Sequence, residues 1–142
     1  MKHTVLFICI HNSARSQMAE AFLNHLAGDQ FIARSAGLEP GKLNPIVVQV
    51  MAELGIDIAE NQVKSITTLL QKHPHVDTVI TVCDGASAER CPVIPGFTGN
   101  RLHWEFDDPS AAHGSAEEIL QTARRIRNQI KDRIMHFIAT MP

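Results

Sequence analysis

The chain opens with a run of apolar residues that contains no alternating polar positions. Val5 to Cys9 is rich in β-branched and aromatic side chains, which is typical of a parallel strand covered on both faces. After Arg15 the apolar positions take the spacing of a helix, and Gly28 marks its end. The apolar stripe of this helix consists of Met18, Ala21, Phe22, Leu23 and Leu26. The pattern therefore predicts a buried strand followed by an amphipathic helix.

A second unit of the same kind follows. Phe31 to Ser35 predicts a strand that leads into Ala36-Gly37, and Pro45 is typical of the first residue of a helix that ends before Gly55. The apolar positions of this helix are Val47, Val48, Met51 and Leu54.

The second half of the chain continues the alternation. Ser65 to Lys72 predicts a short helix, and Val76 to Val82 predicts a buried strand that ends at Cys83. The stretch from Asp84 to Gly99 predicts a loop because it contains several glycines and prolines, and Arg101 to Trp104 predicts a short last strand.

The last predicted element is a long helix that begins with a capping box at Ser115 to Glu118. Its core stripe is expected to be Ile119, Ala123, Ile126, Ile130, Ile134 and Phe137. Basic residues fill the remaining positions and are expected to cover the solvated side, namely Arg124, Arg125, Arg127, Lys131 and Arg133.

The order of these elements predicts an α/β fold. We expect a three-layer sandwich in which helices flank a four-stranded parallel sheet, built by right-handed crossovers as one domain over residues 1–142. Ligands of such sheets bind beyond the carboxyl ends of the strands. Cys9, Ser35 and Cys83 each end a predicted strand, so they are expected to converge on one rim.

Composition excludes several classes of function. A net charge of −2 gives no broad positive field, which argues against a general binder of nucleic acid or of an acidic membrane. The longest apolar run, Thr4 to Ile10, is far shorter than the roughly 20 residues of a membrane span, and it lacks the features of a signal peptide. The odd number of cysteines, 3, fits a reducing compartment, so a cytoplasmic location is expected.

The segment from Cys9 to Ser16 joins the first strand to the first helix. This arrangement directs backbone N–H groups and the positive helix end toward one point, where an anion would bind. The same field favours a thiolate at Cys9, and Arg15 can hold a tetrahedral oxyanion while Cys9 attacks its centre. The alternative is a buried structural cysteine. The predicted oxyanion-binding residues are Ile10, His11, Asn12, Ser13, Ala14, Arg15 and Ser16.

The other two cysteines, Cys83 and Cys91, leave three interpretations open. They are redox partners of Cys9, inert thiols or metal ligands. The chain has 8 histidines, but they are scattered, and no closely spaced Cys/His pair lies near Cys83 or Cys91. We therefore expect no bound metal.

Several segments together resemble the low-molecular-weight protein tyrosine phosphatase superfamily, and most closely its thiol-coupled arsenate reductases. The resemblance covers essentially the whole chain. Its matching segments are Val5 to Cys9, His11 to Glu20, Ser35 to Gly37, Asn44-Pro45, Gly55 to Ile58, Val82 to Asp84, Cys91-Pro92 and His103 to Pro109. Glu105 departs from the family pattern, which commonly has glycine there.

The resemblance implies roles for the cysteines. Cys9 attacks arsenate, Cys83 attacks the Cys9 adduct and expels arsenite, and Cys91 then attacks Cys83. A Cys83–Cys91 disulfide remains for an external reductant. Asp108 matches the general acid of the phosphatases, with Asp107 as a nearby alternative.

The resemblance also implies support for the loop below Cys9. Asn12, Glu20 and Ser35 match positions that coordinate a monovalent cation in some reductases of the family. The fourth position, usually Asp in those members, is Lys64 here. We hypothesise that the Lys64 ammonium replaces the cation and pairs with Glu20; the alternative is a solvated surface charge.

The predicted function is arsenate reduction without a bound cofactor. Thioredoxin is the favoured external reductant, with glutaredoxin and glutathione as the alternative, and a monomer is expected. Two other functions stay open. One is a phosphatase, although Ser110-Ala111-Ala112 after the Asp-Pro pair and the absence of tyrosine offer little to hold a phenyl ring. The other is a non-enzymatic oxyanion or redox sensor.

Overall fold

The central element is a four-stranded sheet in which all strands are parallel. The structure, a computed structural model, describes residues 2–83, 94 and 97–141, and of Cys83 it describes only the backbone. The strands are β1 (His3–Cys9), β2 (Phe31–Gly37), β3 (Thr78–Cys83) and β4 (Asn100–Glu105), in the order β2-β1-β3-β4. The predicted α/β fold with a four-stranded parallel sheet is confirmed.

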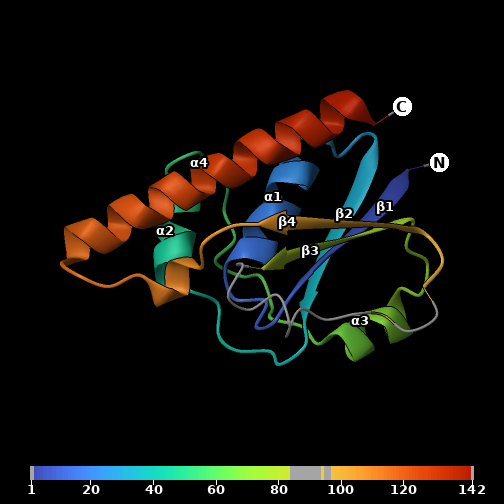
Figure 1. Cartoon of the computed structure of the whole chain (residues 1–142), viewed down its shortest axis with the longest axis horizontal. Coiled ribbons are helices and arrows are strands. Elements are labelled where there is room, and N and C mark those ends of the chain that lie inside the picture. Colours follow the sequence, from blue (N-terminus) through green and yellow to red (C-terminus); the bar gives the residue numbers. More distant parts are fainter. Residues whose placement is uncertain (1, 84–93, 95–96, 142) are drawn as a thin grey trace.

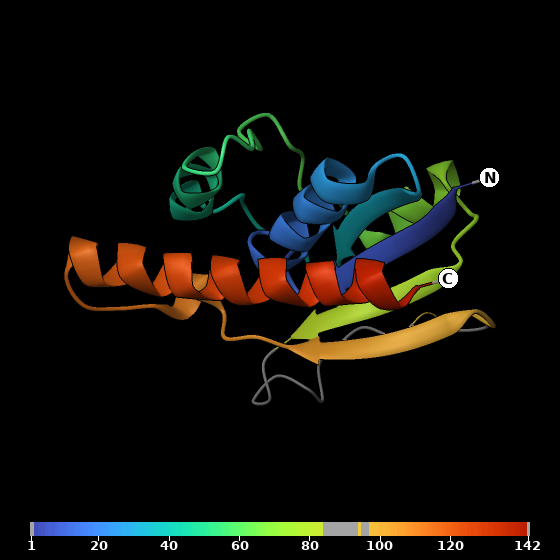
Figure 2. The ribbon, with the colours of Figure 1, turned by 90° about the horizontal axis from the view of Figure 1, so that it is seen from above.

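Helices cover both faces of the sheet. They are α1 (Arg15–Ala27), α2 (Pro45–Ala52), α3 (Ile66–Lys72) and α4 (Ala116–Thr140), with a short 3-10 helix η2 (Pro109–Ala111) before α4. Figure 1 places α4 and α3 on opposite sides of the sheet. In Figure 2, α4 passes between α1 and α2 on one side and β3 and β4 on the other, and β3 and β4 point the same way.

The core has two parts, one on each face of the sheet, and β1 contributes residues to both. Phe7 and Cys9 belong to the larger cluster, which includes residues of α1, α2 and α4. Leu6 and Ile8 belong to the smaller cluster, where Leu69 of α3 packs. The uninterrupted apolar run of β1 thus reflects burial on two sides, as the sequence predicts.

Three of the described α-helices begin at a residue whose side chain caps the helix. The Asn44 side chain accepts the N–H groups of Ile46 and Val47 at the start of α2, and Ser65 caps α3. Ser115 and Glu118 form the predicted capping box of α4. These caps satisfy backbone N–H groups that have no partner within the helix.

Some sequence predictions about single positions are wrong. Arg127, predicted to lie on the solvated side of α4, is buried, because its guanidinium donates to the carbonyl oxygen of Val50 (2.9 Å) and to Glu53 (2.7 Å) on the α2 side. Leu26 is exposed because Ala27 is the buried residue of the last turn of α1, and Leu54 lies beyond the end of α2. The strand that begins at Phe31, by contrast, ends at Gly37, within the Ala36-Gly37 pair where the sequence predicts its end.

Within the described residues, none of the helices is long and apolar enough to cross a membrane.

Candidate active site

The Cys9 sulfur lies at the end of β1 and is enclosed by the loop that follows it. The backbone N–H of Asn12 donates to Sγ at 3.0 Å, and the Ser16 hydroxyl lies 3.0 Å from the same atom. Cys9 itself is buried. A buried sulfur at the end of a strand, held by the loop that follows it, is suitably placed to act as a nucleophile.

Asn12 is the strained residue of the loop. Its φ of 54° lies in the left-handed region, which asparagine tolerates better than most residues. The side chain is fully buried, donates from Nδ2 to the Ser16 hydroxyl (2.8 Å), and accepts the backbone N–H of Lys64 (3.0 Å) at Oδ1. These contacts hold the residue whose backbone N–H points at the Cys9 sulfur.

Gln17 is a supporting residue that the sequence analysis did not single out. Its Nε2 lies within hydrogen-bond distance of Asn12 Oδ1 (3.1 Å), and also donates to the carbonyl oxygen of Gln62 (3.0 Å). The Asn61 side chain donates to Gln17 Oε1 at 3.2 Å. Gln17 is fully buried, although the sequence shows only a polar residue in the first turn of a helix.

Gly37 allows the loop to pack closely on the end of β2. A Cβ atom at this position would lie 2.9 Å from backbone atoms of Ile10, His11 and Asn12. The Gly37 N–H donates to the carbonyl oxygen of Lys64 at 2.8 Å. A side chain at position 37 would therefore displace the loop that encloses Cys9.

Arg15 connects the loop with the Asp-Pro segment after β4. Its Nη1 donates to the carbonyl oxygen of Phe106 (3.0 Å), and its Nη2 lies 3.5 Å from Asp108 Oδ2. Asp108 Oδ1 accepts the backbone N–H of Ser110 at 2.9 Å. Of the two adjacent aspartates, Asp108 contacts the arginine of the loop, whereas Asp107 pairs with the exposed Arg125 (3.5 Å) on α4.

A small pocket forms where these groups meet. It is lined by Cys9, His11, Ser13, Ala14, Arg15 and Asp108. A nucleophile, a buried cation and a carboxyl group thus share one cavity, which matches the needs of a tetrahedral oxyanion. Ile10, Asn12 and Ser16 are buried and are not among the residues that line it.

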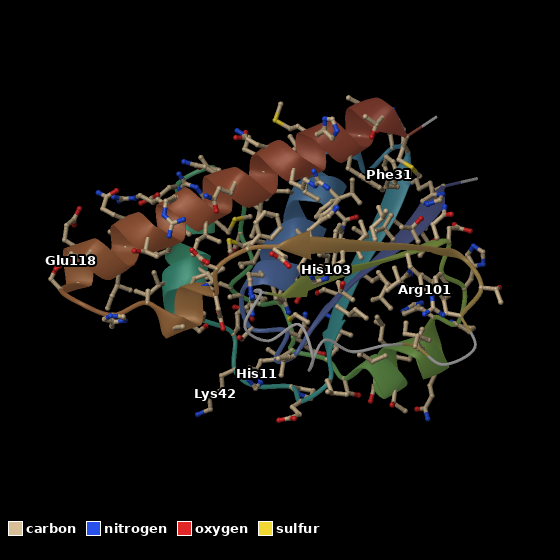
Figure 3. All side chains as sticks on the ribbon, viewed as in Figure 1. His11, Phe31, Lys42, Arg101, His103 and Glu118 are labelled. Carbon is tan, nitrogen blue, oxygen red and sulfur yellow. The ribbon has the colours of Figure 1, made fainter. Side chains whose placement is uncertain are left out.

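The His11 side chain is turned toward the loop after β2. Its Nδ1 lies 2.9 Å from the carbonyl oxygen of Glu39, and the ring lies over Gly41. Figure 3 shows His11 at the same end of the molecule as Lys42. The described contacts of the ring are therefore with this loop.

Glu20, Ser35 and Lys64 meet beneath the loop. The Ser35 hydroxyl donates to Glu20 Oε1 at 2.9 Å, and Lys64 Nζ lies 4.0 Å from the same oxygen. Burial raises the pKa of Glu20 above its ordinary value, and the Lys64 charge opposes that rise. Lys64 Nζ also donates to the carbonyl oxygen of Gln62. An ammonium group among these oxygens does not fit a cation-binding set.

The relay cysteines are only partly described. Cys83 ends β3, in register with Glu105 of β4, and β3 lies next to β1 in the sheet. Its side chain and the whole of Cys91 lie outside the described residues. Among the residues that the structure describes, no cluster of His, Cys, Asp or Glu has the arrangement of a metal site.

A cysteine and an arginine in a strand–loop–helix segment, at the carboxyl edge of a four-stranded parallel sheet, define a class of oxyanion-binding proteins. The chain belongs to the low molecular weight phosphotyrosine protein phosphatase family, whose model matches residues 4–141. This result confirms the family resemblance drawn from the sequence motifs.

Individual relatives are arsenate reductases. The arsenate reductase of Halalkalibacterium halodurans is 43% identical over 140 residues, which cover 98% of this chain and 97% of that protein. The structure of arsenate reductase from Archaeoglobus fulgidus has a TM-score of 0.77 at 31% identity and covers 95% of this chain and 98% of that one. A thioredoxin-dependent arsenate reductase of Corynebacterium glutamicum has a TM-score of 0.61 at 32% identity, covering 95% of this chain and 63% of that one.

Proposed function

We propose that this protein reduces arsenate to arsenite, with Cys9 as the nucleophile and an external thiol as the source of electrons. One observation carries the proposal: the enclosed Cys9 sulfur shares a small pocket with Arg15 and Asp108. Relatives that match almost the whole chain and are arsenate reductases support the same reaction.

The first step forms a bond between sulfur and arsenic. The Cys9 thiolate attacks arsenic(V) while Arg15 and the backbone N–H groups of the loop hold the other oxygens. One arsenate oxygen leaves as water after it receives a proton, and Asp108, in the same pocket, is the donor. The product is a covalent Cys9–arsenic(V) adduct.

Reduction follows by a thiol relay. Cys83 attacks the Cys9 sulfur and forms a Cys9–Cys83 disulfide, and the electron pair of the sulfur–arsenic bond leaves with arsenic as arsenite. Cys91 then attacks Cys83, which releases the Cys9 thiolate and leaves a Cys83–Cys91 disulfide. The family resemblance supports this order, and the position of β3 beside β1 favours Cys83 as the first partner of Cys9.

An external dithiol then returns the enzyme to its starting state. Thioredoxin is the reductant we favour, and the thioredoxin-dependent arsenate reductase of Corynebacterium glutamicum supports that choice. Such a cycle requires a reducing compartment, so we place the protein in the cytoplasm, acting as a monomer without a bound cofactor.

We further propose that Lys64 makes the loop independent of a monovalent cation. Its ammonium lies 4.0 Å from Glu20, and its backbone N–H holds Asn12. Turnover is therefore expected to be unchanged when potassium replaces sodium at constant ionic strength, whereas Lys64→Met is expected to lower it. Strong activation of the unmodified protein by potassium would contradict this role.

The function is tested by arsenate-dependent NADPH oxidation in the presence of thioredoxin and thioredoxin reductase. Unmodified protein is expected to turn over, and Cys9→Ser, Cys83→Ser and Cys91→Ser are each expected to abolish sustained turnover. The same proteins are assayed for hydrolysis of an aryl phosphate.

Two results would point to the other functions. Hydrolysis of the phosphate ester without arsenate turnover, lost only in Cys9→Ser, would make the protein a phosphatase. Oxyanion binding or disulfide formation without repeated turnover would make it a sensor.

A further inference from the structure

A closed ring of contacts joins the Cys9 loop, the start of α2 and the segment that carries Asp108. Starting from the loop, the carbonyl oxygen of Ser13 accepts the backbone N–H of Asn44 at 3.0 Å. Asn44 Nδ2 donates to the Ser110 hydroxyl at 3.0 Å, and the Ser110 backbone N–H donates to Asp108 Oδ1 at 2.9 Å. The Asp108 carboxylate returns to Arg15 of the loop at 3.5 Å. The reaction steps above use neither Asn44 nor Ser110.

The position of the Asn44 side chain is fixed by its role in α2. Its Oδ1 accepts the N–H groups of Ile46 (2.8 Å) and Val47 (3.4 Å) and so caps the helix. This use of the oxygen directs the amide nitrogen toward Ser110. Asn44 thus lies at the start of a helix that is itself joined to α4 through the contact of Arg127 with Val50.

Ser110 belongs to the segment that carries Asp108. It is the second residue of η2, the single turn that Asp108 caps. The Ser110 side chain therefore ties this turn to α2, while the backbone N–H of the same residue holds one oxygen of the Asp108 carboxylate. A shift of η2 would move the carboxyl group relative to the Cys9 sulfur.

We propose that Asn44 and Ser110 are positioning residues for Asp108. They hold its carboxyl group at the distance from the loop that proton transfer to the departing arsenate oxygen requires, without touching the oxyanion. This inference rests on the acid role of Asp108 proposed above. General acid catalysis depends on placing the donor within hydrogen-bond reach of the atom that receives the proton.

The test is the single-turnover rate of arsenite formation by the full-length protein, without external reductant, at a series of arsenate concentrations. Ser110→Ala removes the hydroxyl but keeps the backbone N–H that holds Asp108. Asn44→Ser keeps a capping oxygen for α2 but is too short to reach Ser110. Each is expected to lower the saturating rate about three- to tenfold, the effect of one lost hydrogen bond, and to change the half-saturating arsenate concentration less than about twofold.

The control variants separate positioning from general damage. Ser110→Thr keeps a hydroxyl and is expected to retain most of the rate, and Thr67→Ala, on the exposed side of α3, is expected to have no effect. Ser110→Ala in an Asp108→Asn background is expected to cause no further loss, because its effect passes through the Asp108 carboxyl group.

The measured rates distinguish failure of the acid role of Asp108 from failure of the positioning role of Asn44 and Ser110. An unchanged rate in Asp108→Asn would remove the acid role of Asp108, and this inference with it. A slow Asp108→Asn together with normal rates in Ser110→Ala and Asn44→Ser would overturn this inference alone. An equal loss from Ser110→Ala in both backgrounds would also overturn it, because the effect would not pass through Asp108.

Discussion

At the scale of single residues, the reactive group and its supports differ in where they lie along the chain. Cys9, Asn12, Arg15 and Ser16 are close in sequence, and their contacts follow from one loop and the start of α1. The groups that hold this loop come from remote positions, such as Lys64 through its backbone N–H. A short motif thus supplies the chemistry, while distant residues fix its geometry.

Gly37→Ala tests the close packing of the loop on β2. The added Cβ would lie 2.9 Å from loop backbone atoms, which are unable to yield without moving the donors around Cys9. We expect the free energy of unfolding to fall by about 1–3 kcal/mol and turnover to fall about 10- to 100-fold.

Gly41→Ala is the matched control. A Cβ there would lie 3.5 Å from the His11 side chain, an ordinary contact, so little change in unfolding or turnover is expected. Equal effects of the two substitutions in urea unfolding and in turnover would show that packing at Gly37 is not special.

Glu20 gives the protein a pH-dependent stability. Burial raises its pKa in the folded state, so the folded protein holds the proton more tightly than the unfolded chain does. The stabilisation that this proton provides is fully present below the pKa of Glu20 in the unfolded chain, about 4.3. It is lost as the pH rises through the pKa of Glu20 in the folded protein. Glu20→Gln is expected to remove this decrease in stability with rising pH. The free energy of unfolding, measured in urea from about pH 4 to about pH 8, tests this. If the free energy of unfolding depended on pH in the same way in the unmodified protein and in Glu20→Gln, this role of Glu20 would be contradicted.

The residues that sequence analysis identified are those whose chemistry is visible in the motif. Cys9 and Arg15 meet in one pocket with Asp108, as the predicted roles require. Gln17 was missed because a polar residue in the first helical turn usually faces solvent, and only the tertiary structure buries it against Asn12.

At the scale of secondary structure, α4 is attached to α2 by charged groups as well as by apolar packing. Arg127 and Arg124 both contact Glu53, each at 2.7 Å. Arg127 is the buried member of this group and also donates to the carbonyl oxygen of Val50. The salt bridges of Glu53 lower the pKa of its carboxyl group, with the Arg124 hydrogen bond as the largest cause.

Arg127→Ala is expected to destabilise the contact between α2 and α4. The substitution leaves a buried carbonyl oxygen without its donor, and we expect a loss of about 2 kcal/mol in the free energy of unfolding. Arg125→Ala, which removes an exposed pair with Asp107, is the comparison and is expected to cost less than about 0.5 kcal/mol. The free energy of unfolding of both variants is measured in urea. Equal decreases in the two variants would contradict the assignment of Arg127 to the core.

The elements themselves were predictable because their signals are local. The apolar run of β1, the proline at the start of α2 and the capping box of α4 each act within a few neighbouring residues. The burial of Arg127 was not predictable from the sequence. The periodicity of α4 indicates a basic face but does not indicate that α2 packs against part of this face.

At the scale of the whole molecule, the parallel sheet assembles the site. The carboxyl end of β1 carries Cys9, the segment before α3 carries Lys64, and the segment after β4 carries Asp108. Alternating strands and helices predict that such segments meet at one edge of the sheet. The family resemblance favours Asp108 over Asp107, and the contact of Asp108 with Arg15, which no sequence pattern specifies, supports that choice.

The most direct test of the relay is a single turnover without external reductant. Reduced protein is mixed with arsenate, arsenite is quantified, and the disulfide is located by peptide mapping. We predict one equivalent of arsenite and a Cys83–Cys91 disulfide, and in Cys91→Ser a Cys9–Cys83 disulfide with the same arsenite yield. Arsenite release without loss of thiols, or a disulfide that excludes Cys83, would contradict the proposed relay.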